Sequence, residues 1–305
     1  MVTENGSRER EMPVPPQIMG TVLGTQGQGI RYWLYGEKGH PIVLCNSLFG
    51  SVDRWSELVT HFARTHRLLL WEYQGHGLSA GSGRGSDATV RSFARDALLL
   101  LDGVEIDRAI FVGHGFGVQV ILEAYRTKPE KMLSIIGISG AEGGRLSALA
   151  RLNFGSLLSR CLENVVLPLG VPFWRLVQAA WTAYLPLREE MRQKAAGPAS
   201  SGDESAGVVL AQRIARTDPW IGMRVLGSML FYRPGSLLPR LSVPVLLLGG
   251  TEDRLVSPER YADMARSIPQ ARLVLLQGCS HQLLDEQPER VNRLVQDFLA
   301  EQGLA

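Results

Sequence analysis

The chain has 305 residues, of which 45% are apolar and 20% charged, with a formal net charge of +2. This balance is typical of a soluble globular protein, and the length accommodates one large domain with an insertion. Because the basic residues are scattered rather than gathered into a stripe, nothing indicates a nucleic-acid partner. The three cysteines are few and odd in number, which favours reduced thiols in a cytoplasmic protein over a secreted disulfide framework.

Residues 1–16 are polar and charged and contain three prolines. They predict a flexible N-terminal tail rather than a signal peptide. The most apolar later stretch, residues 165–174, is interrupted by two prolines and is far shorter than the roughly 20 residues that span a bilayer. We therefore expect no transmembrane segment, although such a stretch can still lie against lipid or an apolar ligand.

Short runs rich in Val, Ile and Leu alternate with segments of helical period along most of the chain. This alternation is typical of an α/β fold in which helices cover both faces of a doubly wound, mostly parallel sheet. The predicted strands are residues 30–35, 42–45, 68–73, 109–112, 134–139, 243–248 and 273–277. One helix is predicted to begin at Ser257 and Pro258. Another begins near Pro288, because the apolar residues that follow it line one helical face.

The alternation breaks between residues 140 and 242, where helical patterns occur without a convincing strand. We expect these residues to form a helical cap inserted into a core made of residues 17–139 and 243–305. Residues 195–207, rich in Gly, Ala and Ser, predict a mobile loop within the cap. Ordinary packing explains each aromatic residue of the cap, but together they are consistent with the roof of an apolar pocket: Phe154, Phe173, Trp174, Trp181, Tyr184, Trp220, Phe231 and Tyr232.

Residues 111–117 read Phe-Val-Gly-His-Gly-Phe-Gly at a predicted strand-to-helix turn. A G-x-S-x-G pattern at such a turn presents a nucleophilic serine, but here Gly115 stands at the centre of the pattern. A dinucleotide-binding fingerprint is the alternative interpretation. It requires a third glycine at position 118, where the chain has Val118, and Gly117 comes one place too early.

Four further segments occur in a recognisable order: Asn-Ser-Leu at residues 46–48, a Gly-rich turn at 71–79, Gly-Thr-Glu-Asp at 250–253 and Gly-Cys-Ser-His at 278–281. With them, the chain resembles the lid-bearing α/β-hydrolases of the esterase, lactonase and epoxide-hydrolase-like group. The resemblance extends from about residue 28 to the C-terminal helix. The Asn-Ser-Leu form resembles that of enol-lactonases, and the Gly-rich turn departs from the group's pattern at Glu72 and Gln74.

The resemblance implies that these loops meet at the carboxyl ends of parallel strands. It further implies that Asp253 orients His281, which acts as a general base, and that the backbone N–H groups of Leu48 and Phe116 form an oxyanion hole. Gly115 occupies the nucleophile position without a side chain. The neighbouring residues expected to line the same crevice are Asn46, Ser47 and His114, the last as a packing residue.

Loss of the nucleophile from a triad typically lowers turnover about a millionfold, so an ordinary serine-esterase mechanism is excluded for this sequence. Four explanations stay open. The His281 and Asp253 pair could activate water or a bound substrate directly. A relocated nucleophile could act instead, the candidates being Ser47, Cys279 and Ser280. The chain could be a non-catalytic ligand- or partner-binding pseudohydrolase, like the N-myc downstream-regulated proteins, which also lack the serine. It could also be an ordinary serine hydrolase with an inactivating Ser-to-Gly replacement.

The favoured interpretation is a hydrolase-superfamily enzyme that acts on a small, mainly apolar substrate with an ester, lactone or carbonyl group. The resemblance implies no cofactor. No spacing of His, Cys or carboxylate residues indicates a metal site. The sequence carries no signal for the oligomeric state.

Overall fold

The computed structural model describes residues 12, 14–79, 87–143, 170–172, 174–176, 179 and 217–305. Within these ranges eight strands form one sheet in the order β1-β2-β4-β3-β5-β6-β7-β8. Their bounds are β1 (Ile18–Leu23), β2 (Gly29–Tyr35), β3 (Pro41–Cys45), β4 (Arg67–Trp71), β5 (Ala109–His114), β6 (Met132–Ile138), β7 (Val245–Gly250) and β8 (Ala271–Leu276). β2 pairs antiparallel with β1 and β4, and every other neighbouring pair is parallel.

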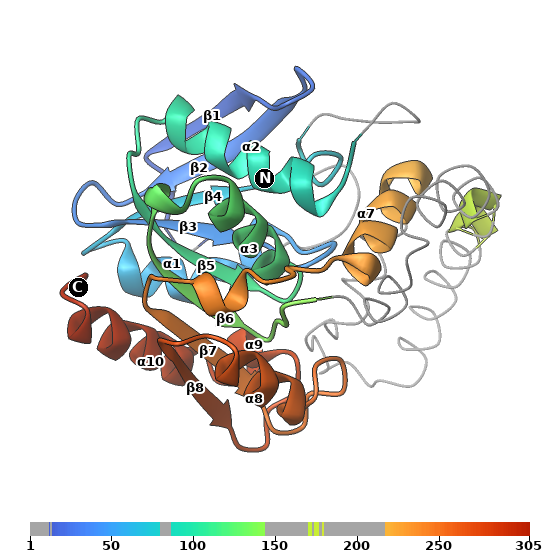
Figure 1. Ribbon diagram of the computed structural model, residues 1–305. Helices are drawn as coiled ribbons and strands as arrows, with labels where there is room; N and C mark the ends of the chain where they lie inside the picture. The colour runs from blue at the N-terminus through green and yellow to red at the C-terminus, as the bar shows by residue number, and fades with distance from the viewer. Residues whose placement is uncertain are drawn as a thin grey trace, which may run out of the picture.

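Helices cover both faces of the sheet (Figure 1). They are α1 (Ser56–Phe62), α2 (Val90–Gly103), α3 (Gly117–Thr127), α7 (Pro219–Phe231), α8 (Pro258–Arg266), α9 (Leu283–Glu286) and α10 (Pro288–Glu301), with short 3-10 turns η1 (Val52–Trp55), η2 (Pro129–Lys131) and η5 (Leu238–Arg240). One hydrophobic cluster joins the sheet to α2, α3 and α8, and a second joins it to α1, α9 and α10. The predicted doubly wound, mostly parallel α/β fold is therefore confirmed.

All seven predicted strands lie in the sheet, but the edge strand β1 was missed. Its apolar residues Ile18, Met19 and Leu23 are exposed, so burial imposes no alternating pattern on it. The strand predicted at residues 243–248 begins instead at Val245 and continues to Gly250. The strand predicted at residues 68–73 is observed as Arg67–Trp71.

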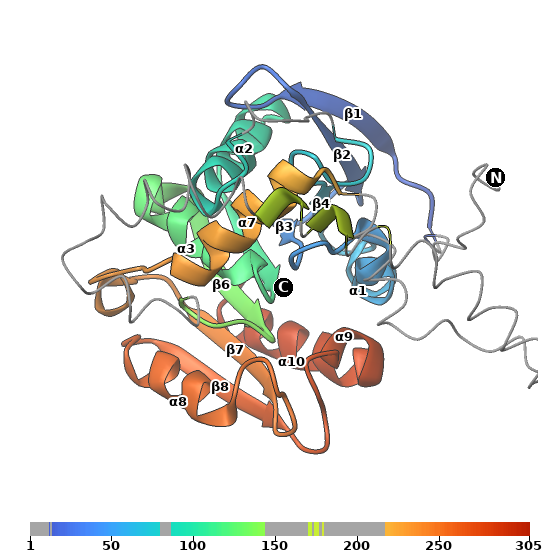
Figure 2. The same cartoon turned by 90° about the vertical axis from the view of Figure 1, so that its right-hand side faces the viewer.

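Most of the predicted cap, residues 140–242, lies outside the described residues, as do residues 1–11, the predicted loop at 195–207, and the aromatics Phe154, Phe173, Trp181 and Tyr184. The described part includes α7 and helical residues at 170–172 and 174–176. The Ile221 side chain of α7 packs directly on Gly75, and the Ser228 hydroxyl accepts a hydrogen bond of 2.9 Å from the Val90 N–H. α7 thus lies over the turn that follows β4 and against the start of α2 (Figure 2).

The backbones of β3 and α3 approach each other closely at Gly117. A Cβ atom at this position would overlap the carbonyl oxygen of Cys45 and lie 3.0 Å from the carbonyl oxygen of Asn46. Gly113 on β5 also allows a close approach of the backbone, because a Cβ there would lie 2.7 Å from the carbonyl carbon of Gly117. The two glycines therefore allow the end of β3 and the start of α3 to lie side by side.

We expect Gly117→Ala to destabilise the fold by about 2 kcal/mol, because overpacking against a backbone atom cannot be relieved by a rotamer change. Gly227→Ala is the matched control: Gly227 lies inside α7, where an added Cβ meets no described atom within 4 Å. It should leave stability unchanged or raise it by up to about 1 kcal/mol through helix propensity. Urea unfolding of both variants measures the difference, and equal effects would contradict the packing argument.

Candidate active site

Gly115 forms the turn between β5 and α3 with a φ of +54°, in the left-handed region that glycine adopts without strain. Its N–H donates a 2.9 Å hydrogen bond to the carbonyl oxygen of Ile138. A Cβ atom on Gly115 would lie 3.3 Å from Ser47 Cβ and 3.4 Å from His281 Nε2. Any side chain at position 115 would therefore project between the loops that follow β3 and β8.

Asp253 follows β7 and His281 follows β8, at neighbouring carboxyl ends of parallel strands. The distance from His281 Nδ1 to Asp253 Oδ2 is 2.8 Å. Because a carboxylate only accepts hydrogen bonds, Nδ1 carries the proton of this bond, and Nε2 is the ring nitrogen that lies 3.4 Å from the Cβ position of Gly115. The Asp253 side chain is fully buried, whereas 18% of the His281 side chain is exposed, so solvent or a ligand can reach the ring but not its partner.

The Asp253 carboxylate accepts hydrogen bonds on both oxygens. Oδ1 accepts the backbone N–H groups of Leu255 at 2.8 Å and Val256 at 2.9 Å, and Oδ2 accepts the Tyr261 hydroxyl at 2.7 Å besides the imidazole of His281. Burial by itself raises the pKa of this carboxyl. The hydrogen bonds from His281, Tyr261 and Val256 outweigh burial and bring the pKa down to about 2. Asp253 is therefore an anion under all ordinary conditions.

Side-chain contacts fix both ends of the loop that carries His281. The Ser280 N–H and hydroxyl both donate to the carboxylate of Glu286. On the other side, Arg54 of η1 forms an ion pair of 2.6 Å with Asp285 in α9. These contacts restrain the backbone of the loop from which the His281 side chain extends.

His114, the last residue of β5, also supports this loop. Its Nε2–H donates a 3.2 Å hydrogen bond to the carbonyl oxygen of His281. The pKa of His114 lies well below its usual value, mainly because the ring is buried, so the ring stays neutral. The structure therefore links the His114 side chain to the backbone of His281.

The backbone N–H groups of Leu48 and Phe116 lie on the two turns that flank Gly115, and Phe116 is the N-cap residue of α3. Among the described residues, neither N–H has a hydrogen-bond acceptor. Both donors are adjacent to the β3 and α3 backbones that Gly117 brings together. This arrangement can present two N–H groups to a single oxygen of a bound molecule.

Asn46 is only 2% exposed and directs its polar groups into the protein. Its Nδ2 donates to the carbonyl oxygen of Trp71 at 2.8 Å, and its Oδ1 accepts the indole N–H of Trp55. Its backbone carbonyl accepts the Tyr73 hydroxyl at 2.7 Å. Both polar atoms of the side chain therefore anchor the loop that begins after β3 to neighbouring elements.

The three candidate replacement nucleophiles are arranged unfavourably. Ser280 is engaged with Glu286, and Cys279 is 1% exposed, with a pKa that burial raises. Ser47 lies closest, but the atom that approaches the Cβ position of Gly115 is its Cβ. Its hydroxyl oxygen lies more than 3.8 Å from that point, because the three nearest atoms are Ser47 Cβ, His281 Nε2 and a backbone oxygen.

Two of the predicted cap aromatics have different environments. Trp174 packs on Phe49, which follows Leu48 in the loop after β3, with ring centroids 5.6 Å apart. Phe49 also stacks on His76, with ring centroids 5.7 Å apart. Burial lowers the pKa of His76 to about 4. Tyr232 lies away from these contacts, and its hydroxyl donates a 3.3 Å hydrogen bond to the carboxylate of Glu123 on α3.

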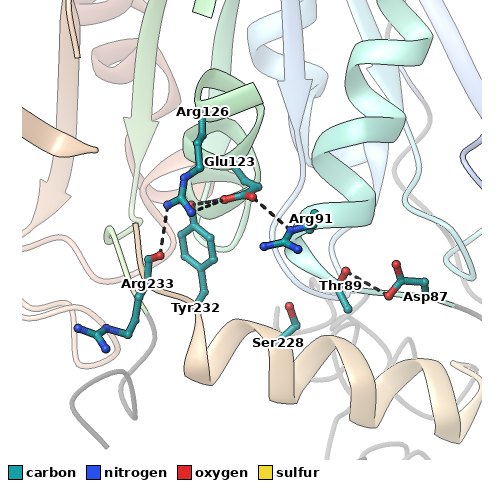
Figure 3. A pocket seen from close by; sticks show the side chains of 8 residues that line it. All are labelled: Asp87, Thr89, Arg91, Glu123, Arg126, Ser228, Tyr232 and Arg233. Atoms are coloured by element: carbon teal, nitrogen blue, oxygen red, sulfur yellow. Dashed lines mark hydrogen bonds and ion pairs between the residues drawn. The ribbon is translucent and has the colours of Figure 1, made fainter. Parts of the chain in front are cut away.

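Figure 3 shows the cavity beside Tyr232, which has a volume of about 330 Å³ and lies between α2, α3 and α7. Its lining is mainly polar and charged, and the buried Glu123 forms ion pairs there with Arg91 and Arg126 at 3.6 and 3.4 Å. None of the site residues predicted from the sequence lines it. The cavity is therefore separate from the His281 site.

Tyr261, Arg54 and Tyr73 contribute to the site but were not identified from the sequence. Tyr261 lies eight residues after Asp253, and Arg54 is more than two hundred residues from the loop it braces. The only sequence signal for these three residues was the position of Tyr261 on the predicted helix that follows the loop carrying Asp253. Such contacts arise from folding and leave no local pattern.

Across the residues that the structure describes, no group of three or more His, Cys, Asp and Glu side chains is arranged to hold a metal ion. Within the same ranges, no helix has the length and apolar character needed to cross a membrane.

Comparison with known proteins agrees with the observed fold. Residues 40–288 match the family described as alpha/beta hydrolase fold. The relative RutD of Pseudomonas savastanoi, a carbamate hydrolase by name, is 27% identical over 85% of this chain and 93% of its own length. Esterase YbfF of Escherichia coli is 24% identical over 85% of this chain and 92% of its own. The crystal structure of the enol-lactonase from Burkholderia xenovorans superposes with a TM-score of 0.67 and 21% identity, covering 92% of this chain and all of that one.

The chain belongs to the α/β-hydrolase fold family. Its named relatives include a carbamate hydrolase and an esterase, which supports the expectation of a hydrolase-like enzyme.

The lowered pKa of Asp253 predicts a specific pH dependence of stability. Since the folded-state pKa of about 2 lies below the usual unfolded value, ionised Asp253 stabilises the fold above that unfolded value, and the contribution is lost as pH falls toward 2. We expect Asp253→Asn to be less stable than the unmodified chain by about 2 kcal/mol at pH 6, with the gap narrowing by pH 3.

Urea unfolding at several pH values measures this gap. The exposed Asp297 on α10 provides the control, because Asp297→Asn should show a small difference at every pH. A gap for Asp253→Asn that stays constant with pH would contradict the assignment of a strongly hydrogen-bonded carboxylate.

Proposed function

We propose that the protein is a hydrolase that cleaves a small ester, lactone or related carbonyl substrate without a covalent intermediate. The observation that carries this proposal is the His281 imidazole, held by Asp253 at 2.8 Å, with Nε2 3.4 Å from the position that a side chain at residue 115 would occupy. A base and its orienting carboxylate are present, but Gly115 offers no atom to acylate. The nucleophile that fits this arrangement is water.

In this mechanism a water molecule binds beside Gly115 and donates a hydrogen bond to His281 Nε2. His281 takes the proton as the water oxygen attacks the substrate carbonyl carbon, and Asp253 stabilises the resulting imidazolium. The Leu48 and Phe116 N–H groups stabilise the oxyanion that forms. Collapse of this intermediate breaks the bond to the leaving oxygen, which receives the proton from His281.

The arrangement of the nearby nucleophilic residues supports water over a relocated side chain. Ser280 and Cys279 are engaged or buried, and the Ser47 hydroxyl is directed away from the Cβ position of Gly115. Asn46 acts in this proposal by fixing the loop that carries Leu48, since both polar atoms of its amide are hydrogen-bonded to protein partners. His114 acts in the same indirect way on His281.

The proposed substrate is mainly apolar. Phe49, in the loop that follows β3, packs against Trp174, and both aromatic side chains are buried. We propose that residues 140–242 form the cap that encloses the substrate, with α7 as the helix that attaches it to the core. The two named hydrolase relatives are consistent with a carbonyl-centred substrate.

A ligand-binding pseudohydrolase is the second candidate, and Gly115 itself is the observation that favours it. Without a serine, the same crevice could hold an ester or lactone without cleaving it. The two candidates differ in whether the unmodified chain turns over substrate, which the following experiments measure.

His281→Ala should lower kcat/KM of the unmodified chain by 10²- to 10⁴-fold on a panel of acyl esters and lactones, about the contribution of a general base. His61→Ala is the matched control, because His61 is exposed on α1 and bonded to Gln296, away from the site. It should leave turnover unchanged. Turnover that survives in His281→Ala would exclude His281 as the base.

Gly115→Ser should create a conventional serine hydrolase. The added Cβ would lie 3.4 Å from His281 Nε2, so its hydroxyl falls within hydrogen-bonding reach after shifts of a few tenths of an ångström. We expect a burst of the first product and an acyl adduct visible by mass spectrometry. Gly115→Ala, with no hydroxyl, should show neither.

The unmodified chain should show steady turnover with no burst and no adduct. Activity confined to Gly115→Ser would instead support the pseudohydrolase candidate.

A further inference from the structure

Tyr261 lies on α8 with its side chain completely buried, and its hydroxyl donates a 2.7 Å hydrogen bond to Asp253 Oδ2. The same oxygen accepts the proton on Nδ1 of His281. The tyrosine hydroxyl and the imidazole therefore share one acceptor atom. The other carboxylate oxygen is occupied by two backbone N–H groups.

The tyrosine ring is held rigidly in this position. It packs against Gly249 near the end of β7, so closely that a side chain at residue 249 would overlap the ring. The neighbouring Arg260 donates a 2.7 Å hydrogen bond to the carbonyl oxygen of Gly143, which fixes the start of α8. Burial and the bond to Asp253 raise the pKa of the Tyr261 hydroxyl, so it remains a donor at all working pH values.

We infer that Tyr261 is a positioning residue that acts on His281 through Asp253. By donating to Oδ2, its hydroxyl fixes the rotation of the carboxylate and draws electron density from the oxygen that faces the imidazole. This inference rests on the proposed role of His281 as the base. In that role the tyrosine limits how tightly the imidazolium is held, so that His281 releases its proton to the leaving group.

Removal of this hydroxyl has a predictable consequence. With one donor fewer, Asp253 Oδ2 carries more negative charge toward the imidazole and stabilises its protonated form more strongly. The ring should then become protonated at higher pH than in the unmodified chain. The titratable and charged groups near this chain of hydrogen bonds include Asp253, His114, Arg54 and Arg260, and the two arginines pair with Asp285 and Glu142 respectively.

Tyr261→Phe tests the inference without requiring turnover. The NMR signals of the His281 ring, followed over pH, should show a titration midpoint about 0.5 pH units higher than in the unmodified chain. If the chain turns over substrate, the acid limb of the kcat/KM profile should move by the same amount. A folded Tyr261→Phe variant with an unchanged midpoint overturns the inference.

Tyr125→Phe is the matched control, because Tyr125 is also buried and its hydroxyl is also hydrogen-bonded, to Ser242 at 2.9 Å. It removes the same atom far along α3 from the site, so the His281 midpoint should not move. A shift of equal size in this control would show a general effect of destabilisation and would also overturn the inference.

A second measurement applies if Tyr261→Phe does not fold. In the unmodified chain labelled with ¹³C at tyrosine Cζ, the Tyr261 signal should move over the pH range in which the His281 ring titrates. His281→Ala should abolish this movement. A Tyr261 signal that does not respond to His281 overturns the inference, whereas absence of turnover in every variant contradicts only the proposed function.

Discussion

The close contact between the backbones of β3 and α3 at Gly117 is the constraint on which the site depends. Because no Cβ separates them, the loop after β3 and the first turn of α3 lie directly beside each other. The N–H groups of Leu48 and Phe116 belong to these two segments, and Gly115 lies between them. In a parallel sheet the loops after β7 and β8 emerge at the same edge, which brings Asp253 and His281 to the same place.

Among the described residues, few buried groups carry a charge at the carboxyl ends of the strands near His281. Burial keeps the rings of His76 and His114 neutral, and Asp253 is the buried anion that faces His281. Four hydrogen bonds satisfy its carboxylate, one of them from the imidazole of His281. Gly115 lies in the turn between β5 and α3 with a positive φ, which glycine adopts without strain.

Much of the fold was predictable because strong local patterns coincide with buried elements. The central strands are continuous apolar runs, and α10 begins at Pro288 as expected from its amphipathic pattern. The edge strand β1 was missed because one of its sides is unpaired and three of its apolar residues, Ile18, Met19 and Leu23, are exposed. Of the predicted cap, residues 140–143, a few residues between 170 and 179, and residues 217–242 lie in the described part, so its extent stays a prediction.

The sequence by itself determined the α/β fold, the order of the loops and the absence of a serine at position 115, since these follow from apolar periodicity and from the identity of single residues. Only the tertiary structure decided what each polar side chain contacts. It turned the Asn46 amide toward Trp71 and Trp55, and it directed the Tyr261 hydroxyl onto Asp253. The physical reason is that a hydrogen bond depends on the positions of two atoms within a few tenths of an ångström, and for residues on different elements those positions are set by packing and not by local sequence.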